Sequence, residues 1–167
     1  MKARFETLAI KSEHLRNSFA ITVSDMVKEV GSYLGRRVWL SEAGALPDDL
    51  SDSIVMLVVG QAFGGEARRQ LLAQLALRAP LGISVFGHGA EAGFDELVNT
   101  LSVHPELPQV MTSVAEESDP SEAIEAFFHS RWPSDDRFDE WTGYGIVVAG
   151  DGDLRGEVER VAKAVLT

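Results

Sequence analysis

The sequence predicts a single α/β domain over residues 1–167, a three-layer sandwich on a mainly parallel sheet of about five strands. Segments typical of strands alternate with segments typical of helices, and this alternation forms right-handed βαβ units with parallel strands. The run 53–60 is apolar and largely β-branched, as expected for a strand covered on both faces. Hydrophobic residues make up 45% of the chain and charged residues 25%, which indicates a globular protein.

The first part of the chain is predicted to hold two strands around one helix. Residues 3–10 alternate weakly, which indicates a strand. The apolar residues of 15–34 recur at steps of three and four, so this range is predicted to form a helix that ends at Gly35. Residues 38–40 indicate a short strand. Residues 43–52 are small and acidic and include a proline, so they are predicted to form a loop.

The middle of the chain repeats strand and helix twice. After the strand at 53–60, residues 66–79 are rich in Ala, Leu, Arg and Gln and predict a helix. A strand at 83–86 and a helix at about 94–101 follow, and a further strand is predicted at 110–114.

The last part begins with a helix whose start is marked by its capping residues. Ser118 or Asp119 can cap it, and Pro120 suits its first position. Its apolar side consists of Ile124, Phe127 and Phe128. A loop, a core strand and a final helix then follow at residues 132–143, 144–149 and 154–166.

Composition excludes several kinds of chemistry. The chain has no cysteine, so it forms no disulfide, thiolate zinc site or thiol nucleophile. Its first six residues lack the apolar core of a signal peptide, and its longest apolar run, 54–59, is too short to cross a bilayer. We therefore expect a soluble, cytoplasmic protein.

The charge of the protein is concentrated in one stretch. The net charge is -11, from 26 acidic and 15 basic residues. Residues 91–140 hold 13 of the acids but only two bases, Arg131 and Arg137, so the remaining 13 acids and 13 bases cancel. An acidic surface repels nucleic acids and anionic membranes, and we expect neither as a partner. A basic protein is the partner that this stretch predicts.

Polar residues follow several of the predicted strands, where parallel α/β sheets bind ligands. His88, Glu116 and Asp151 are the candidate catalytic residues, and Glu117 and Asp153 lie beside them. Carboxylates suit Mg²⁺ or Ca²⁺, and a histidine beside carboxylates can act as a general base. Alternatively, the aspartates cap helices and the glutamates are solvated loop residues. We expect no tightly bound metal, nucleotide or other cofactor.

Glycine-rich loops at 60–65 and 87–93 also follow predicted strands. Such loops can bind phosphate through backbone N–H groups, but neither matches a phosphate-binding motif. No Lys or Arg lies within them, although Arg68 and Arg69 come just after the first. The alternative interpretation is that both loops are tight strand-to-helix turns.

The loop at 132–141 combines three large aromatic residues with four acids. Aromatic residues supply binding energy at interface centres, and acids speed the arrival of a basic partner. The alternative is that the aromatic side chains fold inward and fix a long connection to the core. The predicted partner-binding residues are Trp132, Asp135, Asp136, Phe138, Asp139, Glu140 and Trp141.

Residues 53–150 carry an order of motifs that resembles a small bacterial α/β domain family whose activity is unknown. In that family a strand ends in A-W-G, a helix begins with W-D-D-S-V-D, and a later strand reads V-M-T-T-W-H before acidic residues. This chain has V-F-G at 85–87, F-D-E-L-V-N at 94–99 and V-M-T-S-V-A-E-E at 110–117. The sequence F-F-H at 127–129 follows and matches the family's helix with aromatic residues. The resemblance implies the fold and a bacterial origin, and it brings no activity with it.

Two hypotheses for function therefore stand. In the first, the protein is a non-catalytic, acidic interaction protein of the immunity or regulatory type that binds a basic protein. In the second, it is a small-ligand or metal-dependent enzyme with its site at the carboxyl ends of the strands. The sequence leaves the oligomeric state open.

Overall fold

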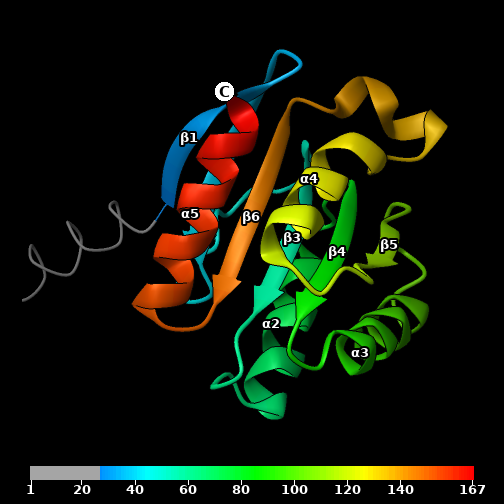
Figure 1. Ribbon diagram of the computed structural model, residues 1–167. Helices are drawn as coiled ribbons and strands as arrows, with labels where there is room; N and C mark the ends of the chain where they lie inside the picture. The colour runs from blue at the N-terminus through cyan, green and yellow to red at the C-terminus, as the bar shows by residue number, and fades with distance from the viewer. Residues whose placement is uncertain (1–26) are drawn as a thin grey trace, which may run out of the picture.

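The computed structural model describes residues 27–167, which form a six-stranded sheet in the order β1-β2-β6-β3-β4-β5, flanked by helices (Figure 1). The strands are β1 (Val27–Tyr33), β2 (Arg36–Glu42), β3 (Ser53–Val59), β4 (Gly82–Gly87), β5 (Met111–Val114) and β6 (Gly143–Ala149). The helices are α2 (Gly65–Leu77), α3 (Ala90–Ser102), α4 (Pro120–Ser130), α5 (Gly152–Leu166) and the 3₁₀ helix η1 (Asp135–Glu140).

The predicted α/β class and the mainly parallel sheet are confirmed. Only β1 and β2 pair antiparallel, and the other four neighbouring pairs are parallel. The described sheet has six strands rather than about five. The predicted strand at 3–10 and the first part of the helix predicted at 15–34 lie outside the described residues.

The helix predicted at 15–34 is wrong over its described part, because residues 27–33 form β1. The pairing with β2 shifts register between Glu29 and Gly31, which marks a β-bulge. Val30 and Tyr33 are three residues apart, yet both pack against one hydrophobic cluster. Because of the bulge, the apolar residues of this strand that face the core are three residues apart, which is a spacing typical of a helix. Leu34 and Gly35 have φ values of 48° and 77° and form the two-residue turn of a hairpin.

The strand β3 is buried along its whole length and lies between β6 and β4. Ile54, Met56 and Val58 pack in a cluster with side chains of α4 and α5. Val55, Leu57 and Val59 belong to a second cluster that includes side chains of α2 and α3. The prediction that this apolar run is a central strand covered on both faces is confirmed.

Capping residues fix the starts of two helices as the sequence predicts. The Asp119 carboxylate accepts a hydrogen bond from the Ser121 backbone N–H at 2.7 Å, and Pro120 is the first residue of α4. The Asp151 carboxylate accepts one from the Leu154 N–H at 2.9 Å at the start of α5. Both charges lie at helix N-termini, where the helix dipole stabilises them.

The edge strand β1 is held against α5, and the two run side by side in Figure 1. Lys28 Nζ donates to Glu159 Oε1 at 2.6 Å, and Lys163 Nζ donates to the same oxygen at 2.7 Å. These two hydrogen bonds lower the pKa of Glu159 to about 2. Gly31 leaves room for Leu166, because a Cβ at Gly31 would lie 3.0 Å from its Cδ1.

We expect Val58→Asp to unfold the protein or to lower its free energy of unfolding by at least about 3 kcal/mol, since it places a carboxylate among the apolar side chains of the buried cluster. The matched control is Val103→Asp, because Val103 is 71% exposed at the end of α3. Urea denaturation followed by circular dichroism measures both. Equal stabilities for the two variants would contradict the burial of β3.

Candidate functional site

The residues predicted to follow the strands do not come together at one place. Glu116 borders a shallow hollow beyond β4 and β5, whereas Asp151 borders a second hollow beyond β3 and β6. His88 is exposed, and its backbone N–H donates to the Val59 carbonyl at 2.8 Å. Within residues 27–167, no group of three or more His, Asp or Glu side chains is placed to hold a metal ion. The absence of a metal or cofactor stays a prediction.

The glycines beyond β3 and β6 accommodate a side chain of the protein itself. The strand order changes direction between these two strands, which is where doubly wound sheets place their ligands. A Cβ at Gly60 or Gly150 would lie 3.0 Å or 2.6 Å from Leu154 Cδ2. Leu154 therefore occupies the space that these glycines leave.

The two cations nearest the glycine loops already have carboxylate partners. Arg68 Nε and Nη2 donate to the two oxygens of Glu96 at 3.1 and 2.8 Å, and this bond lowers the pKa of Glu96. Arg69 pairs with Glu66 at 2.8 Å. A Cβ at Gly89 would lie 2.3 Å from Arg68 Nη1, so this glycine lets the ion pair approach the turn. These contacts support the interpretation of both loops as tight turns.

The acidic loop divides its aromatic residues between surface and core. Trp132 is 58% exposed and Phe138 47%, but Trp141 is only 8% exposed. The four acids, Asp135, Asp136, Asp139 and Glu140, are all exposed on or beside η1. Each of the two interpretations of this loop therefore describes some of its aromatic residues.

Trp141 is fixed by hydrogen bonds and by contacts with a guanidinium and a neighbouring ring. Its Nε1 donates to the Gly143 carbonyl at 3.1 Å. The Arg36 guanidinium lies 3.9 Å from the centre of its ring, a cation–π contact, and Arg36 Nε donates to the Trp141 carbonyl at 3.1 Å. The Tyr144 ring meets it edge-on at 5.2 Å. Trp141 thus anchors η1 to the sheet.

Arg137 forms a second anchor, and its side chain is buried. Its guanidinium donates to the carbonyls of Ala79, Pro80 and Gln109 at 3.2, 3.2 and 2.7 Å. Its Nε donates to Glu140 Oε2 at 3.0 Å. One side chain of η1 therefore holds the connections that enter β4 and β5.

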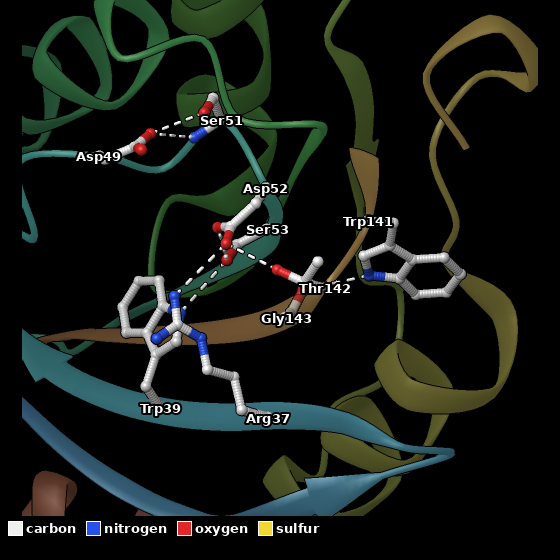
Figure 2. Close-up of polar contacts among 9 residues, drawn as sticks. All are labelled: Arg37, Trp39, Asp49, Ser51, Asp52, Ser53, Trp141, Thr142 and Gly143. Atoms are coloured by element: carbon white, nitrogen blue, oxygen red, sulfur yellow. Dashed lines mark hydrogen bonds and ion pairs between the residues drawn. The ribbon is translucent and has the colours of Figure 1, made fainter. Parts of the chain in front are cut away.

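Asp52 fixes the chain where η1 leads into β6 (Figure 2). Its carboxylate accepts a hydrogen bond from Thr142 Oγ1 at 2.6 Å and is 3.4 Å from Arg37 Nη2. Its backbone carbonyl accepts from the N–H groups of Thr142 and Gly143. The Ser53 hydroxyl donates to the same carboxylate. Figure 2 shows this cluster beside the Trp141 indole, at the end of the sheet where its parallel strands begin.

Between the β1–β2 turn and η1 lies an aromatic groove of about 370 Å³. Its lining consists of Tyr33, Leu34, Arg36, Phe128, His129, Trp132, Phe138, Trp141 and Tyr144. The Tyr144 hydroxyl is buried and has no hydrogen-bond partner among the described residues. Burial raises the pKa of Tyr144 to about 12, so the phenol stays protonated at neutral pH.

Comparisons with models of protein families, with curated proteins and with solved structures found no match. The resemblance to a bacterial α/β family stays a prediction. Among residues 27–167, no helix combines the length and apolar character that crossing a membrane requires.

Sequence reasoning missed several residues that shape the acidic loop and its groove. Leu34 lies in the range predicted to be a helix, and Arg36 lies between that helix and the predicted strand at 38–40, yet both line the groove. Asp52 fell in a predicted loop. Arg137 offered one signal, because it is a single base among four acids in a ten-residue loop.

We expect Trp141→Ala to lower the free energy of unfolding by about 3–5 kcal/mol, because it removes a buried indole and its contacts. For a domain of this size, the melting temperature would fall by about 10 °C. Trp132→Ala is the control and should change stability by less than about 0.5 kcal/mol, since the side chain is mostly exposed. Thermal denaturation of both variants measures the difference, and similar losses would refute the division between core and surface.

Arg137→Lys should lower the free energy of unfolding by about 1–3 kcal/mol, because an ammonium cannot reproduce the fork that reaches three carbonyls. The control is Arg160→Lys, which makes the same substitution on the exposed face of α5, away from η1. Chemical denaturation compares the two. An Arg137→Lys protein as stable as Arg160→Lys would show that these carbonyls do not need the guanidinium.

Proposed function

We propose that this protein is a non-catalytic interaction protein, of the immunity or regulatory type, that binds a basic protein through the acidic segment 132–141 and the aromatic groove beside it. The observation that carries the proposal is the exposure of Trp132 and Phe138 at the groove, within a row of four exposed acids. We also propose that it acts in the cytoplasm of a bacterium.

The aromatic side chains support this proposal because of where they lie. Trp132, Phe138 and Leu34 are large apolar side chains exposed around a single groove. A contiguous apolar patch rimmed by polar residues is typical of an interaction surface. Trp and Phe are enriched at interfaces, and Trp in particular among the residues that carry most of the binding energy.

The charge pattern defines the chemistry of the partner. Asp135, Asp136, Asp139 and Glu140 all reach solvent beside the groove. Glu140 also accepts from Arg137, but that ion pair leaves its side chain 57% exposed. A basic partner would be attracted over a distance set by the salt concentration, so its association rate rises at low salt.

The contacts that hold this surface in place also support a role in binding. Trp141 and Arg137 fix η1 to the sheet and to two connections, and Asp52 fixes the chain that follows. The exposed side chains therefore project from a segment with few ways to move. A preordered surface loses less entropy when it binds, which raises affinity.

The alternative, an enzyme with its site at the carboxyl ends of the strands, gains less support. Glu116 and Asp151 border different hollows, and Asp151 is used as a helix cap. Arg68 and Leu154 fill the spaces beside the glycine loops. A stoichiometric metal that is lost on changing His88 or Asp151 would support this alternative.

To test the proposal, a photo-cross-linking residue is placed at Phe138 and, as the control, at exposed Val103. We expect a light-dependent adduct with a basic protein from position 138 only. With that protein purified, Leu34→Asn and Trp132→Ala should each weaken binding at least about tenfold, as expected when a side chain at an interface centre is removed. Asn tolerates the positive φ of Leu34, so the first variant should fold normally.

Charge reversal of the four acids should slow association, and most strongly at low salt. Stopped-flow mixing at two salt concentrations measures this effect. A partner that binds the reversed variant with an unchanged rate would end the proposal, and so would equal cross-linking from both positions.

A further inference from the structure

A further cavity, of about 210 Å³, lies on the face of the sheet that α4 covers, at the end where β4 and β5 begin. Strand register explains why it is there. Ile54 pairs with Gly82, Gly82 with Met111, and Ser84 with Ser113. Paired residues of parallel strands point to the same face, so a glycine and two serines replace the large apolar side chains found elsewhere in this cluster. Helix α4 ends at Ser130, which borders the cavity, so the space above these small residues stays open.

Polar groups gather in this cavity around a single charge. Its lining consists of Ile54, Gly82, Ile83, Ser84, Met111, Thr112, Ser113, Ser130, Arg131 and Trp132. Three of these residues are serines, and none is acidic. Arg131 is the only charged residue among them. This is notable in a chain whose segment 91–140 contains 13 acids and one other base.

Arg131 keeps unused hydrogen-bonding capacity. Its Nε is buried and has no hydrogen-bond partner among the described residues. Within residues 27–167, Arg131 takes part in no ion pair, whereas Arg137 contacts three carbonyls and Glu140. A buried N–H of a charged group costs free energy unless an acceptor reaches it.

We propose that this cavity binds a small organic monocarboxylate. The carboxylate accepts hydrogen bonds from the Arg131 guanidinium and from the hydroxyl of Ser113 or Ser84. The hydrocarbon part of the ligand packs against Ile54, Met111 and Trp132.

The chemistry of the cavity favours this class over other anions. A planar carboxylate matches a guanidinium in two parallel hydrogen bonds. One cation neutralises one negative charge, and a phosphate dianion would leave a charge uncompensated inside a protein of net charge -11. The apolar walls hold a hydrocarbon chain, which inorganic anions lack. The volume is below that of cavities for drug-sized ligands, so the ligand has few heavy atoms.

Arg131 has a competing role as a cation at the carbonyl end of α4, where a positive charge stabilises the helix dipole. That role concerns stability alone. It requires neither a cavity beneath Arg131 nor an Nε without an acceptor. The two roles are separable, because only the binding role predicts a ligand that distinguishes a carboxylate from its neutral amide.

The experiment titrates the full chain with butyrate, butyramide, butylamine and inorganic phosphate, observed by NMR of backbone amides and of arginine Nε–H groups. We expect butyrate alone to shift the signals of Thr112, Ser113 and Arg131 Nε–H, with an affinity in the millimolar range as suits so small a ligand. Arg131→Gln should weaken butyrate binding at least about tenfold, since hydrogen bonds to charged groups contribute that much. Ser113→Val, which fills the cavity, should do the same.

Arg160→Gln is the matched control, because Arg160 is exposed on α5 and does not line the cavity. It should leave butyrate affinity unchanged. The proposal is overturned if butyramide binds as well as butyrate, if phosphate binds more tightly, or if Arg131→Gln retains affinity while folded. If butyrate shifts no NMR signal and Arg131→Gln only lowers the melting temperature, then Arg131 stabilises the end of α4 and does not bind a ligand. None of these outcomes depends on the partner-binding proposal, which rests on the groove and the acids of η1.

Discussion

The end of the sheet where the parallel strands begin depends on one buried guanidinium. Arg137 reaches the carbonyls of Ala79, Pro80 and Gln109, which belong to two connections distant in sequence from η1. A charge is stable away from water only when its hydrogen-bonding groups are satisfied, so the side chain accepts few alternative positions. The short helix η1 must therefore lie across the entries to β4 and β5. Given that position, Trp141 turns into the core, and Phe138 and the acids face solvent.

Several groups at the carboxyl ends of the strands have partners within the protein. At the carboxyl ends, Leu154 fills the space beside two glycines, Arg68 pairs with Glu96, and Asp151 caps α5. Buried groups without a partner among the described residues lie at both ends: Glu117 Oε2 after β5, and Arg131 Nε and the Tyr144 hydroxyl at the opposite end. Unsatisfied buried groups carry a cost that a ligand can relieve. Arg131 lines the cavity and Tyr144 lines the groove, so both candidate sites lie away from the end where parallel sheets usually bind ligands.

The sequence could predict the centre of the fold because its signals there are local. The apolar run of β3, the Asp119–Pro120 start of α4 and the Asp151 cap of α5 each depend on neighbouring residues, and all appear as predicted. The strand β1 was not predictable in the same way, since a bulge at residues 29–31 gave it helical spacing. Both cavities depend on pairing between distant strands. Ser84 and Ser113 become neighbours only through the register of β4 with β5, and Leu34 reaches the groove only through the hairpin.

The opposite environments of Arg131 and Arg137 explain how a cationic cavity can exist inside the acidic half of the protein. Both bases flank the same short loop, so composition alone treats them as equivalent. Arg137 has its donors occupied by carbonyls and Glu140. Arg131 lines a cavity with serine residues, and no carboxylate lines that cavity. Because the acids of η1 lie in solvent, water screens them strongly, whereas a charge at a partly buried cavity is screened much less. A positive cavity and an acidic outer surface can thus lie on the two sides of Trp132, which borders both the cavity and the groove.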